Sequence, residues 1–214
     1  MIYYTGDIHG SAFELQSLCR KMELTSDDII VLLGDVGANY YGSKRDQRFK
    51  QALNSLGPTL LCVHGNHEQR PNTFSSYQEK TWRGGVVWFE EAFPNLLFPK
   101  DGEIFSLAGL KHLVIGGAYS VDKFYRISRG YGWWPDEQPS EEIKRYVEQQ
   151  IKEKEIETLL DQWEELLEMK SRTSELDFMV AYGYAYGDGK DIKGLVKIAD
   201  ERMYKTKQKQ KEVE

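Results

Sequence analysis

Three apolar runs in the N-terminal part of the chain are each followed, directly or after one residue, by a glycine and then a polar side chain. The runs are residues 2–5, 28–33 and 59–63, and the strings after them are Gly6-Asp7-Ile8-His9-Gly10, Gly34-Asp35-Val36-Gly37 and Gly65-Asn66-His67-Glu68. Continuous apolar runs are typical of strands that are covered on both faces. Helices are predicted between the runs, so the alternation indicates a layered α/β domain with polar side chains at the strand ends.

The segments around these runs extend the prediction. Ser11 is expected to cap a helix whose apolar residues fall at helical spacing, namely Phe13, Leu15, Leu18, Cys19 and Met22. A second helix is predicted over residues 49–56. Further β-type runs at 86–89, 103–107 and 112–115 predict hairpins or a mixed sheet, whereas residues 117–139 form a long aromatic loop.

The pattern changes after this loop. Pro139-Ser140-Glu141-Glu142 is a good helix start, but the apolar stripe from Ile143 to Ile151 resumes at Ile156, a step that rotates the apolar face by roughly 140°. The charged residues 152–155 at this step suit either a solvated helix turn or a junction of unrelated pieces. A strand over 177–185, a helix from 192 to 203 and a Lys-rich tail follow.

The side chains of the three strings suit metal chemistry. Asp and His two residues apart favour Mn²⁺, Fe, Zn²⁺ or Ni²⁺ over Ca²⁺. A second Asp can bridge two ions, an Asn oxygen is a neutral ligand, and His67 follows Asn66 where it can protonate a leaving group. Each string alone is more often a turn or a helix cap. Their occurrence in order at three strand ends favours a metal site, whereas His64 and His112 are expected to be structural.

The composition of the chain argues against some classes of binding partner. The formal charge of −6 does not recruit nucleic acid or an anionic membrane surface. No apolar run reaches the length of a membrane span, and the N-terminus lacks a targeting pattern. Cys19 and Cys62 lack metal-type spacing and are expected to be buried free thiols. We therefore expect a soluble cytoplasmic protein.

The three strings resemble the first three motifs of the calcineurin-like metallophosphoesterase family, with similarity over residues 1 to about 150. That resemblance implies a layered sandwich of mixed β-sheets flanked by helices. It also implies that Asp7 and His9 hold a first metal, that Asp35 bridges, that Asn66 holds a second metal and that His67 acts on the substrate. Ala38 stands where family members often have another Asp.

A second departure concerns the ligands that complete the family's site, a histidine after a later strand and a Gly-His-x-His string. The chain has four histidines, and none follows His112. By the family pattern, the first metal keeps Asp7, His9 and Asp35, while the second keeps only Asp35 and Asn66. The resemblance therefore implies a truncated sandwich with an incomplete dinuclear site.

The C-terminal residues resemble a different family. Residues 155–207, with Tyr182-Gly183-Tyr184-Ala185 and the Ala-Asp-x-x-Met-Tyr string that ends at Tyr204, are similar to the end of a GGDEF-type diguanylate cyclase domain whose signature is absent. The change from one family resemblance to another favours a junction of two unrelated pieces at residues 152–155. We therefore expect a metallophosphoesterase-like domain over 1–150 and, over 151–214, a helix followed by a strand-helix fragment.

Two functional classes follow from these resemblances. The first is a phosphoesterase with one or two divalent metals and weak or no activity, acting on a phosphate-ester small molecule or a phosphorylated substrate, with Arg70 as a candidate substrate contact. The second is a non-catalytic chimeric remnant that binds at most one metal or phosphate. A cyclase-related protein without the signature is a third alternative. Whether the chain is an enzyme stays open, with the family favouring a hydrolase.

Overall fold

The computed structural model describes residues 1–151, 196–201 and 203. The chain divides into two compact units, Met1–Glu153 and Lys154–Glu214. In the second unit, residues 196–201 are helical, within the range 192–203 for which a helix is predicted. The predicted phase change at 152–155, the apolar stripe after it, the strand over 177–185 and the Lys-rich tail lie outside the described residues. Within the described part, no helix is long and apolar enough to cross a membrane.

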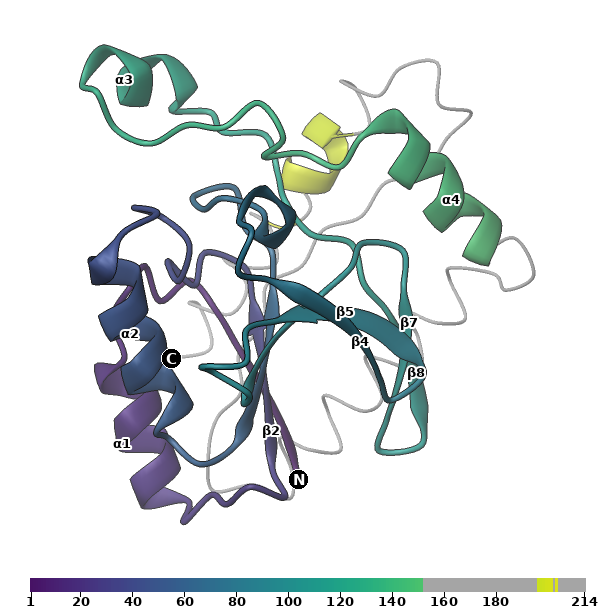
Figure 1. Ribbon diagram of the computed structural model, residues 1–214. Helices are drawn as coiled ribbons and strands as arrows, with labels where there is room; N and C mark the ends of the chain where they lie inside the picture. The colour runs from purple at the N-terminus through teal and green to yellow at the C-terminus, as the bar shows by residue number, and fades with distance from the viewer. Residues whose placement is uncertain (152–195, 202, 204–214) are drawn as a thin grey trace. The chain divides into compact units, whose positions relative to one another are not determined.

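The centre of the first unit is a six-stranded sheet (Figure 1). Its strands are β1 (Ile2–Thr5), β2 (Ile29–Leu33), β3 (Thr59–Val63), β4 (Gln78–Trp82), β5 (Gly85–Phe89) and β6 (Leu96–Pro99). The spatial order is β1-β2-β3-β6-β5-β4, with β1, β2, β3 and β6 parallel and β5 antiparallel to both of its neighbours. The sheet is therefore mixed and flanked by helices, which confirms the predicted fold class.

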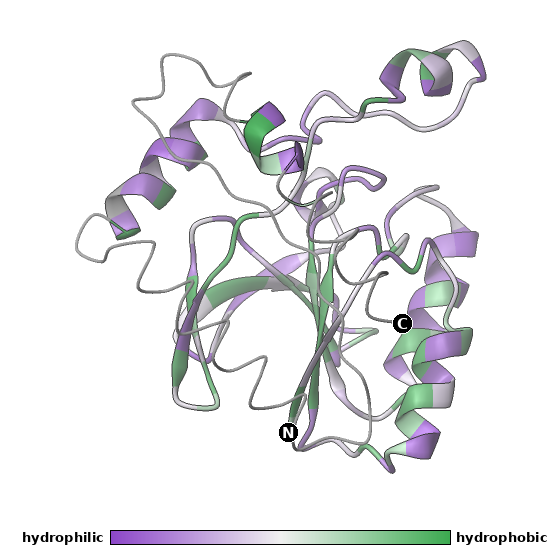
Figure 2. Ribbon diagram, turned by 180° about the vertical axis from the view of Figure 1, so that it is seen from behind, coloured by the Kyte–Doolittle hydropathy of each residue, from purple (hydrophilic) through white to green (hydrophobic). Residues whose placement is uncertain are grey.

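Helices α1 (Phe13–Lys21) and α2 (Lys44–Asn54) lie side by side along one face of the parallel strands (Figure 1). Successive side chains of a strand point to opposite faces, so Ile30 and Leu32 of β2 point to one side and Ile29 and Val31 to the other. All four are buried. In Figure 2 the hydrophobic residues concentrate on the strands, whereas α1 and α2 mix hydrophobic and hydrophilic residues.

The other face of the sheet packs against a two-stranded antiparallel sheet of β7 (Ile104–Leu107) and β8 (Leu110–Leu113). Phe105 and Leu107 of β7 join Val31, Leu61 and Leu97 in one buried cluster. Phe105 has no exposed surface. The small sheet is therefore held to the large one through an apolar interface.

The start of α1 differs from the prediction. The residue before the helix is Ala12, and no side chain caps it. The Ser11 backbone N–H donates to the Ile8 carbonyl at 2.8 Å, so Ser11 belongs to the preceding turn and the predicted cap was wrong. By contrast, α4 (Glu141–Ile151) begins as predicted, because the Ser140 hydroxyl accepts a hydrogen bond from the Ile143 N–H.

Three further elements were not predicted. They are β4, β6 and the short helix α3 (Lys123–Ser128), which interrupts the aromatic loop. A single 3₁₀ turn also covers Pro71–Thr73. Helix α2 begins at Lys44 rather than at residue 49, with the Ser43 hydroxyl accepting from the Arg45 N–H. Both cysteines are buried free thiols, as expected.

Candidate metal centre

The carboxyl ends of β1, β2 and β3 meet at one edge of the sheet because the three strands are parallel. The turns that follow β1 and β2 are hydrogen-bonded to each other. Asp7 N–H donates to the Gly34 carbonyl at 3.1 Å, and His9 N–H donates to the Asp35 carbonyl at 2.8 Å. The first two strings therefore run alongside each other, which places their side chains at the same edge.

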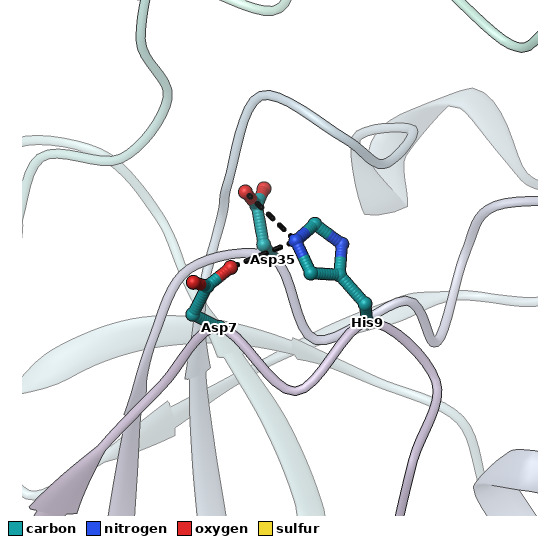
Figure 3. A group of neighbouring side chains, drawn as sticks. All are labelled: Asp7, His9 and Asp35. Carbon is teal, nitrogen blue, oxygen red and sulfur yellow. Dashed lines mark ion pairs between the residues drawn. The ribbon is translucent and has the colours of Figure 1, made fainter.

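Asp7, His9 and Asp35 form a cluster at this edge (Figure 3). His9 Nε2 lies 2.8 Å from Asp7 Oδ1 and 4.0 Å from Asp35 Oδ2. Bonds of about 2.1 Å to a divalent ion would place neighbouring ligand atoms about 3 to 4 Å apart. The two carboxylates and the imidazole therefore fit one such ion with modest adjustment. The Asp7 side chain is 79% exposed and that of Asp35 is 17% exposed, so the cluster opens to solvent on one side.

The backbone of all three cluster residues is left-handed. The φ angles are 59° at Asp7, 41° at His9 and 49° at Asp35. Few non-glycine residues adopt positive φ, although Asp and His tolerate it better than most. Within the described ranges six non-glycine residues do so, and half of them belong to this cluster. Such conformations are concentrated at functional sites, so the backbone singles out the same residues as the side-chain geometry.

The third string packs directly on the second. A Cβ at Gly65 would lie 2.0 Å from Asp35 Oδ1 and 2.1 Å from Asp35 N, so only glycine allows this approach. The His67 backbone N–H then donates to Asp35 Oδ1 at 2.9 Å. The His67 ring meets the His9 ring edge-on, with centroids 5.3 Å apart. The structure therefore brings His67 beside the cluster.

Asn66, the fourth predicted ligand, faces the aromatic loop with its amide nitrogen. Its Nδ2 donates to the Ser120 hydroxyl at 2.9 Å. The same loop approaches His67 through Asp122, whose Oδ1 lies 3.9 Å from His67 Nε2. Within the described residues no other group of three His, Cys, Asp or Glu side chains clusters as Asp7, His9 and Asp35 do.

Glu68 is a buried residue to which the sequence patterns gave no role. Its carboxylate accepts hydrogen bonds from the N–H groups of Gly65 at 3.0 Å, Gly37 at 3.1 Å and Val36 at 3.4 Å. Burial raises the pKa of Glu68 to about 7, although these hydrogen bonds act in the opposite direction. The carboxylate thus fastens the second string to the third. The sequence did contain one indication of this role for Glu68. The residue lies beside glycine-rich turns, and the backbone N–H groups of such turns need a hydrogen-bond acceptor.

Arg70 and His64 are engaged within the protein. Arg70 Nε donates to the Asp136 carbonyl at 2.7 Å, Nη1 to Asp101 Oδ2 at 2.6 Å and Nη2 to the Gly116 carbonyl at 3.4 Å. These contacts favour a structural role for Arg70 over the predicted substrate contact. His64 is buried, and burial together with the Arg70 charge lowers its pKa to about 3. Its position indicates a neutral packing residue.

One comparison with known proteins gave a match. The family model described as calcineurin-like phosphoesterase matches residues 1–181. The match includes all three strings and extends beyond residue 150, where the sequence patterns predicted the resemblance to end. Comparisons with curated proteins and with solved structures gave no significant match.

Proposed function

Because the chain belongs to the calcineurin-like phosphoesterase family, we propose that it binds divalent metal at the cluster of Asp7, His9 and Asp35 and uses it to hydrolyse a phosphomonoester or a phosphodiester. The family implies divalent metal ions and phosphate-ester substrates in general. The observation that carries the proposal for this chain is the convergence of two carboxylates and an imidazole at one strand edge, within reach of a single ion.

The side chains have distinct roles in this proposal. Asp7 and His9 hold the first ion, Asp35 is shared, and Asn66 is a ligand of the second position. A bound divalent ion supplies Lewis-acid polarisation of a phosphoryl oxygen and lowers the pKa of water. His67 gives a proton to the leaving oxygen, a role supported by its position beside His9 and by the backbone hydrogen bond that fixes it to Asp35.

We further propose that the second position is incomplete and that activity is weak. Of the four histidines in the chain, only His9 and His67 lie at the site. His64 is buried, and His112 Nε2 in β8 of the small sheet pairs with the Tyr4 hydroxyl of β1 at 2.6 Å. By the family pattern, the second ion keeps Asp35 and Asn66 as its protein ligands among the residues that the structure describes. Mn²⁺, Fe, Zn²⁺ and Ni²⁺ all suit the first position.

The small number of histidines at the site also supports the alternative, a non-catalytic remnant that binds one metal or phosphate. In that proposal residues 155–207 are a fragment of a GGDEF-type domain, as the similarity of their sequence suggests. This fragment is joined to the phosphoesterase-like part of the chain near residues 152–155. The family match extends into this segment, to residue 181, which supports a continuous phosphoesterase domain instead. A cyclase-related activity has the least support, because the signature of that family does not occur in the chain.

Metal binding and hydrolysis separate these proposals. Mn²⁺ binding is measured by calorimetry, and hydrolysis of bis(p-nitrophenyl) phosphate by absorbance, for the full chain and for Asp7→Asn, Asp35→Asn and His67→Ala. Asp27→Asn, an exposed carboxylate at the opposite end of β2, is the matched control.

For a phosphoesterase we expect wild type and the control to bind Mn²⁺ and to hydrolyse the ester. Asp7→Asn and Asp35→Asn should lose Mn²⁺ binding, whereas His67→Ala should keep binding and lose turnover. Binding without any turnover would favour the remnant. Wild-type binding no stronger than that of Asp7→Asn would refute the metal site itself.

A further inference from the structure

We infer that Ser120, Arg126 and Glu137 are positioning residues that fix which atom of the Asn66 amide is available to a metal ion. This inference rests on the proposed role of Asn66 as a ligand. The three residues come from the aromatic loop and α3, far along the chain from the strings at the strand ends. All three are buried, with exposed fractions of 1% for Ser120, 2% for Arg126 and 4% for Glu137.

The Ser120 hydroxyl has two buried charged partners, which fix the direction of its hydrogen bonds. It donates its one proton to Glu137 Oε2 at 2.6 Å, because a carboxylate can only accept. It accepts from Arg126 Nη1 at 2.8 Å, because a guanidinium can only donate. One acceptor position remains on the hydroxyl oxygen, and it faces the Asn66 amide.

This arrangement decides the orientation of the Asn66 amide. The amide group lies 2.9 Å from Ser120 Oγ and must present its NH₂ group there, because the oxygen atom would face a second lone pair. The two ends of an amide look alike in shape, so only the hydrogen-bond network distinguishes them. With Nδ2 committed to Ser120, Oδ1 is the atom left for a cation.

The network itself is firmly held. Arg126 Nε donates to the Gly132 carbonyl at 2.9 Å, and Nη2 contacts the same oxygen. Arg126 Nη1 also reaches the Asn66 carbonyl oxygen at 3.3 Å. Glu137 Oε1 accepts from the Ser120 backbone N–H at 3.1 Å. Both the backbone and the side chain of Asn66 are therefore tied to residues of the aromatic loop.

The consequence concerns the second metal position. If Ser120 loses its hydroxyl, the Asn66 amide can rotate and present either end to an approaching ion, and the NH₂ end repels it. Partners that orient metal ligands are worth about 10–100-fold in metal affinity. Among the described residues, the Ser120 hydroxyl is hydrogen-bonded to Asn66, Arg126 and Glu137. None of these three belongs to the cluster of Asp7, His9 and Asp35, so the affinity of that cluster should not change.

The first test needs no metal. The Asn66 Nδ2 protons, assigned in the ¹⁵N spectrum of the full chain by their loss in Asn66→Ala, should exchange with water at least about tenfold more slowly than those of the exposed Asn72. In Ser120→Ala they should exchange as fast as those of Asn72. Equal rates for Asn66 and Asn72 in wild type, or no change in Ser120→Ala, would overturn the inference.

Mn²⁺ titration followed by electron paramagnetic resonance is the second test. We expect Ser120→Ala and Glu137→Gln to weaken binding at the weaker position about tenfold or more and to leave the first binding event unchanged. Ser128→Ala is the control, because the Ser128 hydroxyl in the same loop donates its hydrogen bond to the Tyr125 carbonyl and, within the described part of the chain, to no side chain of the network. Unchanged weak binding in both variants would refute the inference. If wild type bound no Mn²⁺, the proposed function would fail, while proton exchange would still decide how the amide is held.

Discussion

The ion pair of Lys50 and Glu90 provides a quantitative test of the packing between α2 and the sheet. Lys50 Nζ lies 2.6 Å from Glu90 Oε2, and the side chains are only 6% and 13% exposed. The ammonium also lies 4.7 Å from the centroid of the Tyr77 ring. Lys50→Met keeps most of the volume but leaves the Glu90 carboxylate without its counter-charge.

Removing one partner of a buried ion pair lowers the free energy of unfolding by about 3–5 kcal/mol. With a urea dependence of about 2 kcal/mol per molar, the unfolding midpoint of Lys50→Met should fall by roughly 1.5–2.5 M. Replacing both partners, as in Lys50→Met with Glu90→Met, removes the unpaired charge and should return stability to within about 1 kcal/mol of wild type.

Lys100 offers a matched control on the surface. It pairs with Glu79 at 2.9 Å and lies over the Trp88 ring, but the paired side chains are 37% and 43% exposed. An exposed pair contributes at most about 1 kcal/mol. Lys100→Met should therefore shift the midpoint by less than about 0.5 M, given the same urea dependence.

Urea unfolding followed by tryptophan fluorescence measures these shifts. Four of the five tryptophans lie in the first unit, at positions 82, 88, 133 and 134, so the signal reports mainly on the unit that contains the ion pair. Equal midpoints for Lys50→Met and Lys100→Met would refute the reasoning. A double variant no more stable than Lys50→Met would also refute it, because the unpaired carboxylate would then not be the source of the loss.

Three further outcomes are expected. Phe105→Ala should lower the free energy of unfolding by about 3–5 kcal/mol in the same urea assay, because it empties the centre of the interface between the sheets; a loss under about 1 kcal/mol would contradict that packing. Burial lowers the pKa of His112 below its usual 6.5, so its neutral form, paired with Tyr4, stabilises the fold above that pH and the stabilisation is lost as pH falls below it. His112→Gln should therefore lose less stability than wild type between pH 7.5 and 5 in thermal unfolding, and parallel curves would exclude the linkage. Burial also raises the thiol pKa values of Cys19 and Cys62, so a disulfide reagent should label neither in the native protein and both in urea, with rapid native labelling as the contrary result.

The sequence predicts β2 and β3 well because most residues of both strands are buried. Residues 29–33 are apolar at every position, which few structures other than a buried strand explain. β4 is different, since Gln78–Trp82 is an edge strand with polar residues and pairs on one side only. β6 was not predicted because its four apolar residues end at a proline, and a proline usually argues against a central strand.

The candidate site also has a part that the sequence predicts and a part that it does not. Sequence alone could predict that the turns after three parallel strands meet, so Asp7, His9 and Asp35 could be named as a set. It could not predict the burial of Glu68 or Arg126, because a charged residue in a loop is usually solvated. Only the fold reveals that Glu68 satisfies N–H groups of two neighbouring turns.

The left-handed backbone at Asp7, His9 and Asp35 affects which substitutions evolution would favour at these three positions. A left-handed conformation costs a non-glycine residue about 1–2 kcal/mol, a penalty that glycine does not incur. Glycine at these three positions would relieve the backbone, yet each substitution would remove a candidate ligand. Selection for stability alone would therefore favour glycine here, and selection for metal binding would oppose it. The three side chains mark where these two pressures conflict, and mutational libraries scored separately for folding and for metal uptake should rank glycine oppositely at each position.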